Sequence, residues 1–190
     1  APQLALDRLS MLNGNGALCV IAAVYGNRAY EDTLVQMEDY AQNAGFRVIA
    51  AISAVAEHSI IHEFAAGRPN LDDCKVLTKF GEQVLEKASS NDFSKPSIPG
   101  NRPYKKAGAG MIPKAGSACV SCGQCALKCP ANAISADNLK VSDKSKCISC
   151  MRCVSICPVH ARKVSSLMTT IASAAIKKAC SVEKANELFL

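Results

Sequence analysis

The sequence predicts two parts of different fold class: an α/β part with a partial parallel sheet and helices, followed by a small α+β module. Three observations predict this division. Strand-like and helix-like segments alternate in residues 1–88, and a stretch rich in Pro and Gly follows at residues 89–117. One pattern of four cysteines then occurs twice in residues 118–164, and residues 165–190 have the pattern of a helical tail.

The elements of the α/β part follow from the spacing of its apolar residues. Continuous apolar runs rich in β-branched residues occupy positions 17–25 and 47–55, and both predict buried strands, the first covered on both faces. Apolar residues at helical spacing predict helices at residues 31–44, 59–66 and 71–88. Strand, helix, strand and helix with short connections are typical of a parallel sheet covered by helices.

Two parallel strands by themselves make a poor sheet, because each needs neighbours on both sides. Residues 1–88 are therefore expected to be the C-terminal half of an α/β domain whose other half lies upstream. The chain begins at Ala1 instead of methionine, which favours a fragment, a processed form or a natural truncation.

Eight of the eleven cysteines form two copies of one motif, offset by 28 residues, in which proline follows each fourth cysteine. The copies are Cys119, Cys122, Cys125 and Cys129, and Cys147, Cys150, Cys153 and Cys157. Three cysteines at steps of three direct their thiolates at one iron–sulfur cubane, whereas the fourth cysteine of such a run binds the other cluster. We therefore predict two [4Fe-4S] clusters, held by Cys119, Cys122, Cys125 and Cys157, and by Cys147, Cys150, Cys153 and Cys129.

Two four-cysteine zinc sites are the alternative for the same residues. Zinc sites usually take pairs of C-x2-C separated by a dozen or more residues, so the repeated three-residue steps favour iron and sulfide. The remaining cysteines, Cys19, Cys74 and Cys180, are expected to be small buried side chains.

Charge and hydropathy indicate whether nucleic acid or a membrane is an expected partner of the chain. Residues 1–94 contain 7 Lys and Arg against 12 Asp and Glu, whereas residues 95–190 contain 15 against 4. A basic half raises the question of nucleic acid, but two clusters with their thiolates would remove about 4 to 6 positive charges, so no nucleic acid is expected. No run approaches the roughly 20 apolar residues that cross a bilayer, and no export leader is visible, so we expect no membrane partner and a cytoplasmic location.

The cysteine region resembles the bacterial two-cluster ferredoxins. Their pattern C-x2-C-G-x-C-x3-C-P-x2-A-I is matched from Cys119 to Ile134. The second copy departs from this pattern after Pro158, where it reads VHARKV and places Arg162 at the position equivalent to Ile134.

Most of the chain resembles a bacterial and archaeal family in which a flavodoxin-like domain is fused to such a ferredoxin module. The segments that carry this resemblance are VYGNRAYEDTL, EHSI, AAGRPN, IPGNRPY and the ending ANELFL. The resemblance implies that Gly26, Asn27 and Tyr30 match a loop beside the flavin ring. The family's phosphate-binding loop is absent, so FMN is expected only if the missing upstream half is present as a separate or cleaved chain.

These patterns favour an electron carrier of the ferredoxin type over an enzyme, because no catalytic base or nucleophile is visible. Single electrons would pass through the two clusters to or from a redox protein partner, or FMN in the flavodoxin-like part. Two alternatives remain: an iron–sulfur flavoprotein oxidoreductase acting on its own substrate, and a structural or sensory cluster-binding protein.

Overall fold

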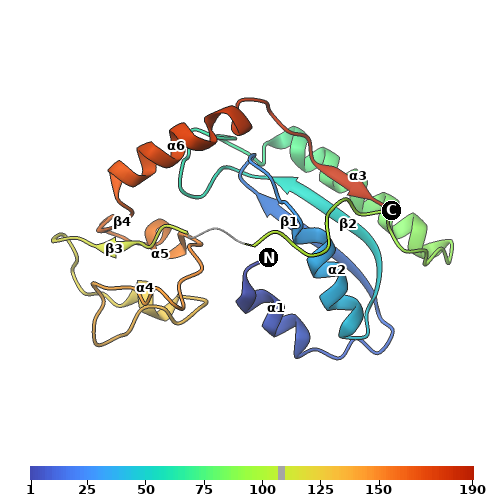
Figure 1. The fold of residues 1–190 in the computed structure, drawn as a ribbon, viewed down its shortest axis with the longest axis horizontal. Coiled ribbons are helices and arrows are strands. Elements are labelled where there is room, and N and C mark those ends of the chain that lie inside the picture. The colour runs from blue at the N-terminus through green and yellow to red at the C-terminus, as the bar shows by residue number, and fades with distance from the viewer. Residues whose placement is uncertain (107–109) are drawn as a thin grey trace. The chain divides into compact units, whose positions relative to one another are not determined.

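The computed structural model describes residues 1–106 and 110–190, which form two compact units (Figure 1). The first unit consists of residues 1–58, 62–107 and 177–190, and the second of residues 59–61 and 108–176. Within the described residues, no helix has the length and apolar character needed to span a membrane.

The first unit is built around a three-stranded mixed sheet. Strands β1 (Leu18–Tyr25) and β2 (Arg47–Val55) pair in parallel, and β5 (Glu187–Phe189) pairs with β2 in the antiparallel direction (Figure 1). The strand order β1-β2-β5 puts β2 in the centre. The parallel pair matches the two predicted strands, but the structure does not show a flavodoxin-like parallel sheet, because the third strand is antiparallel and comes from the C-terminal segment.

Three helices accompany this sheet: α1 (Gln3–Ser10), α2 (Thr33–Asn43) and α3 (Leu71–Ser89). Helix α2 packs on β1 and β2 and contributes Leu34 and Ala41 to the core. Helix α3 contacts β2 and begins with a capping box, in which the Asn70 side chain accepts hydrogen bonds from the backbone N–H groups of Asp72 and Asp73.

Burial of β1 differs from the sequence prediction. Ile21 and Ala23 are buried, but Val20 and Val24, on alternating positions of the strand, are 42% and 70% exposed. Since successive side chains of a strand point to opposite faces, only one face of β1 is covered. The continuous apolar run therefore did not imply two covered faces.

The C-terminal segment also differs from the helical tail that the sequence predicts. Helix α6 (Ser166–Cys180) ends ten residues before the C-terminus, and residues 187–189 form β5. The predicted helix over residues 59–66 is likewise absent, since the described residues there form turns. In both places the tertiary contacts of the backbone outweigh the local helical pattern.

Residues 90–106 of the predicted linker lie in the first unit as an extended arm, whereas residues 110–117 belong to the second unit and include a short strand. Asp32 accepts hydrogen bonds from the backbone N–H groups of Asn101 and Lys105, at 2.8 and 2.7 Å. The Arg102 guanidinium donates to both carboxylate oxygens of Asp39, at 2.7 and 2.6 Å. Residues 107–109 of the linker lie outside the described residues.

The second unit contains four short elements: strands β3 (Lys114–Ala115) and β4 (Arg162–Lys163), which pair antiparallel, and helices α4 (Gln124–Leu127) and α5 (Arg152–Ser155). Most of α6 also belongs to it. Among the described residues its buried apolar side chains are few, and the larger ones are Ile61, Pro113, Ile134 and Met151. The protein as described is therefore a mixed α/β structure with small sheets, and the cysteine motifs lie in its second unit.

Candidate metal centres

The two cysteine motifs adopt the same backbone conformation. Positive φ angles occur at three pairs of positions separated by the 28-residue repeat: Ser121 and Ser149 (55° and 54°), Gly123 and Met151 (75° and 57°), and Asn132 and His160 (47° and 48°). The second pair immediately precedes helices α4 and α5, which begin at equivalent positions. The sequence repeat is therefore a structural repeat, including turns that L-residues rarely adopt.

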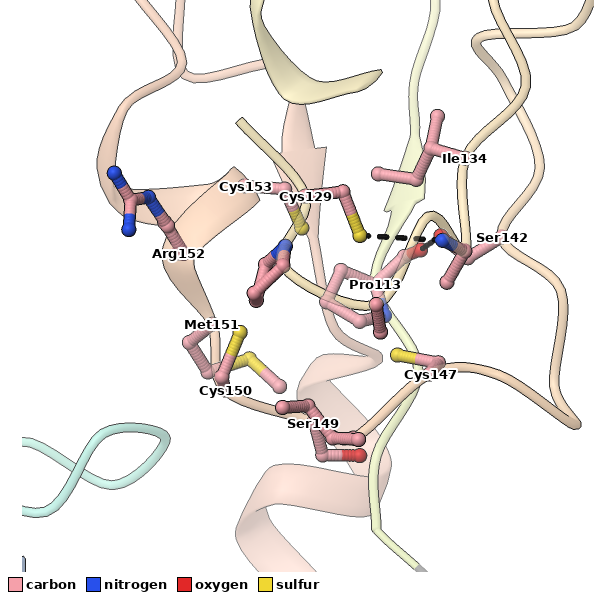
Figure 2. Close-up of a pocket in the computed structure, with 14 residues that line it drawn as sticks. Pro113, Cys129, Ile134, Ser142, Cys147, Ser149, Cys150, Met151, Arg152 and Cys153 are labelled. Atoms are coloured by element: carbon pink, nitrogen blue, oxygen red, sulfur yellow. Dashed lines mark hydrogen bonds between the residues drawn. The ribbon is translucent and has the colours of Figure 1, made fainter. Parts of the chain in front are cut away.

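The first of two cavities in this unit is lined by cysteines from both copies. Its four cysteines are Cys129, Cys147, Cys150 and Cys153 (Figure 2). Apolar parts of its wall come from Pro113, Ile134 and Met151, and the space measures about 360 Å³, part of it open to solvent. Cys129 belongs to the first motif, whereas the other three cysteines belong to the second.

The second cavity has the reciprocal composition. Its four cysteines are Cys119, Cys122, Cys125 and Cys157, and its volume is about 320 Å³, again including space open to solvent. Val120, Leu139 and Val159 contribute apolar wall, and Arg162 lines the same cavity. The structure thus brings together the two sets of four cysteines that the sequence predicts as ligand sets.

Backbone N–H groups point at the sulfur of the fourth cysteine in each motif. The N–H of Ala133 donates to Cys129 Sγ at 3.3 Å, and the N–H of Ala161 donates to Cys157 Sγ at 3.2 Å. These donors stabilise negative charge on sulfur. Burial raises the pKa of Cys157, but the backbone N–H groups of Arg162, Ala161 and Val159 and the positive charge of Arg162 together outweigh it, so the pKa lies below the usual value.

The chemistry of both cavities suits a thiolate-bound group, because each cavity presents four cysteine side chains beside apolar wall. In the described part of the chain, no group of three or more His, Cys, Asp or Glu side chains is arranged so that it could hold a single metal ion. Four thiolates, N–H donors and apolar walls are the surroundings that a [4Fe-4S] cluster takes in proteins.

Comparison with known proteins identifies a domain of this class in the same segment. Residues 118–162 match the model of a family described as the 4Fe-4S dicluster domain. A ferredoxin-type iron–sulfur domain is therefore present, with at least one iron–sulfur cluster supported. No curated protein and no solved structure matches the chain. The number of clusters and the ligand role of each cysteine stay predictions.

One residue of this site had no role in the sequence interpretation. Arg162 is 1% exposed and lies on the wall of the second cavity, whereas its repeat equivalent, Ile134, lies on the wall of the first. The signal in the sequence was the replacement of an apolar residue by arginine in otherwise equivalent copies. A sequence cannot tell whether such an arginine points to solvent or inward.

The three residues that the flavodoxin resemblance associates with flavin lie in the first unit and contact its own chain. The buried Asn27 side chain donates to the carbonyls of Cys180 and Val182 and accepts from the N–H of Lys184, each at 3.0 Å. Gly26 packs closely on His58, where an added Cβ would lie 2.6 Å from Cα.

Tyr30, the third of these residues, packs edge-on against Tyr25 with ring centroids 5.4 Å apart. Its hydroxyl lies 3.4 Å from a Glu187 carboxylate oxygen. Burial and the neighbouring Glu187 raise the pKa of Tyr30 to about 12. Contact of Gly26, Asn27 and Tyr30 with FMN stays a prediction.

The three cysteines outside the motifs differ in burial. Cys180 is buried, Cys19 is partly buried and Cys74 is exposed on α3. The expectation of a buried side chain is therefore wrong for Cys74, because the helix position that it occupies faces away from the strands.

Proposed function

We propose that this chain is a ferredoxin-type electron-transfer protein that passes single electrons through two [4Fe-4S] clusters. The proposed ligands of one cluster are Cys119, Cys122, Cys125 and Cys157, and those of the other are Cys129, Cys147, Cys150 and Cys153. When bound, such clusters supply one-electron redox chemistry. The dicluster domain match at residues 118–162 supports an iron–sulfur electron-transfer role.

The observation that carries the proposal is the exchange of the fourth cysteine between the two cavities. Each set offers four thiolates, one for each iron of a cubane, so the protein leaves no iron coordination position for a substrate. A site that cannot bind substrate at its metal is suited to electron transfer and not to metal-centred catalysis. The shared cysteines also keep the two sites close together, which favours exchange of electrons between them.

The partners follow from the same reasoning. We propose a redox protein as electron donor and another as acceptor, with no nucleic acid and no membrane required. We also propose that the first unit is a partial flavodoxin-like domain that takes FMN only together with a separate or cleaved upstream half. The parallel β1–β2 pair connected through α2 supports this proposal.

The test is anaerobic purification followed by absorbance spectroscopy, iron, sulfide and zinc counts, and flavin extraction. We expect a broad band near about 400 nm with about eight irons and eight sulfides per chain. About four irons per chain would mean that the chain holds one cluster instead of two. A colourless protein with about two zincs per chain would contradict it. Bound flavin would support a relay between flavin and clusters over a simple carrier.

A further inference from the structure

The Arg162 guanidinium is held in place by acceptors from four separate residues, none of them a carboxylate. Nη1 donates to the carbonyl of Leu139 at 2.6 Å and lies 3.6 Å from Cys125 Sγ. Nη2 donates to the carbonyl of Pro113 at 3.1 Å and to the Ser142 hydroxyl. With four partners and 1% exposure, the side chain has one fixed position.

This position connects the two cavities. Arg162 itself lines the cavity of Cys119, Cys122, Cys125 and Cys157. Two of its partners, Pro113 and Ser142, line the other cavity (Figure 2). The guanidinium therefore lines the cavity of one cysteine set and also lies near Cys153 of the other set, where its positive charge opposes the burial that raises the pKa of Cys153.

The described residues supply no carboxylate partner for the charge of Arg162. No ion pair with it occurs among them, and its acceptors are two carbonyls, a hydroxyl and the sulfur of Cys125. Its Nε is buried and has no hydrogen-bond partner in the same part of the chain. Burying an unpaired charge is costly, so a guanidinium in this setting requires a nearby anion.

We propose that Arg162 is the buried counter-charge of the cluster sites and makes their reduction potentials unequal, the site of Cys119, Cys122, Cys125 and Cys157 having the higher one. This inference rests on the proposed function. Reduction adds one negative charge to a cluster, and a cation in a poorly screened interior stabilises that charge. A hydrogen bond to a ligand sulfur acts in the same direction. The other cavity has uncharged Ile134 at the equivalent position, so its site receives less stabilisation.

The test is a redox titration of the full chain, followed by electron paramagnetic resonance, with three variants. Arg162→Gln removes the charge but keeps N–H donors, and Arg162→Lys keeps the charge in a different shape. Lys128→Gln is the matched control, because Lys128 is exposed and directly precedes the ligand candidate Cys129. All three are compared at low and high salt.

We expect two separate potentials in the native protein. Arg162→Gln is expected to lower the equilibrium constant for reduction of the site with the higher potential by at least tenfold. For one electron, this corresponds to a decrease of about 59 mV in the potential. For Arg162→Lys and for Lys128→Gln, the equilibrium constant for reduction should stay within about threefold of that of the native protein. The effect of Arg162→Gln should persist at high salt, since buried charges are screened less than exposed ones.

The outcomes separate this inference from the proposed function. A native protein without iron would contradict the function itself. A native protein with both clusters, and an Arg162→Gln variant with unchanged potentials, would overturn the role of Arg162 and leave electron transfer standing. Loss of iron in Arg162→Gln but not in Arg162→Lys would support a counter-charge, whereas loss in both folded variants would overturn it.

Discussion

At the scale of single residues, the fourth cysteine of each motif has the largest structural consequence. Cys129 and Cys157 each line the cavity whose other three cysteines come from the opposite motif. Each sulfur also accepts an N–H hydrogen bond from the residue four positions later. Each of these two cysteines therefore joins the two repeats, and the backbone N–H group polarises its sulfur.

This exchange of the fourth cysteine predicts which pairs of cysteine substitutions have additive effects on the iron content. Cys129→Ala is expected to remove one cluster, about four of eight irons, because three thiolates bind a cubane less stably than four. Adding Cys147→Ala, in the same cavity, should cost little further iron. Adding Cys119→Ala, in the other cavity, should remove most of the remainder. The measurement is iron and sulfide per chain after anaerobic purification.

Cys74→Ala is the matched control for these variants, because Cys74 is exposed on α3 and outside both motifs. It should retain the native iron content. If Cys129→Ala combined with Cys119→Ala lost no more iron than Cys129→Ala combined with Cys147→Ala, the exchange of ligands would be wrong.

At the scale of elements, the segment between α6 and β5 is fixed by side chains far away in the sequence. Asn27 makes two hydrogen bonds to the backbone of this segment and a third to the last residue of α6, and Arg68 donates to the carbonyl of Lys184 at 2.6 Å. Asn186 accepts from the N–H of Val55 at 2.8 Å and donates to Asp73 at 2.9 Å. These contacts hold residues 187–189 beside β2 as a third strand, where local pattern alone favours helix.

Asn27→Gly tests this anchor. Asn27 has a φ of 62°, which glycine adopts without strain, so the substitution removes the side chain and keeps the turn. Loss of three hydrogen bonds, one buried and two partly buried, at about 1 kcal/mol each should lower the free energy of unfolding of the first unit by about 2–3 kcal/mol. Urea unfolding followed by circular dichroism gives the value.

The control is Asn43→Gly, on the exposed face at the C-terminal end of α2. Asn43→Gly should lower the free energy of unfolding by less than about 1 kcal/mol, as glycine does at an exposed helix position. Equal effects of the two substitutions would mean that the Asn27 hydrogen bonds do not stabilise the C-terminal segment.

At the scale of the whole molecule, the two units differ in what stabilises them. The first unit has a sheet with a packed apolar core that includes Ile21, Leu34 and Ala51. The second has two-residue strands, four-residue helices beside its cysteine motifs, and few buried apolar side chains. Such a module resembles small domains that depend on bound metal for their folding free energy.

Removal of iron is therefore expected to affect the units differently. After anaerobic treatment with a chelator, the amides of residues 118–162 should exchange with deuterium at least about tenfold faster, because unfolding of this segment is no longer opposed by cluster binding. The amides of β1 and β2 should change by less than about threefold. Hydrogen–deuterium exchange with mass spectrometry, before and after chelation, provides the measurement. Equal acceleration in both units would show that the clusters stabilise the molecule as one cooperative unit.

Part of this protein could be predicted from its sequence because the relevant signals are local. Cysteine spacing and the 28-residue repeat indicated a ferredoxin-type domain, which the family match at residues 118–162 confirms. Apolar periodicity located β1, β2, α2 and α3. These features depend on neighbours within a few residues, and local sequence encodes such contacts directly.

Only the tertiary structure decided the features that depend on distant residues. Strand β5 forms because β2, Asn27, Arg68 and Asp73 contact the C-terminal segment from more than a hundred positions away. Val20 and Val24 are exposed because no layer covers that face of β1 in the described structure. Arg162 points inward because Pro113, Leu139 and Ser142 surround it with acceptors. The sequence by itself determined the repeated cysteine motif of the ferredoxin-type domain, while long-range packing decided where a buried charge lies beside those cysteines.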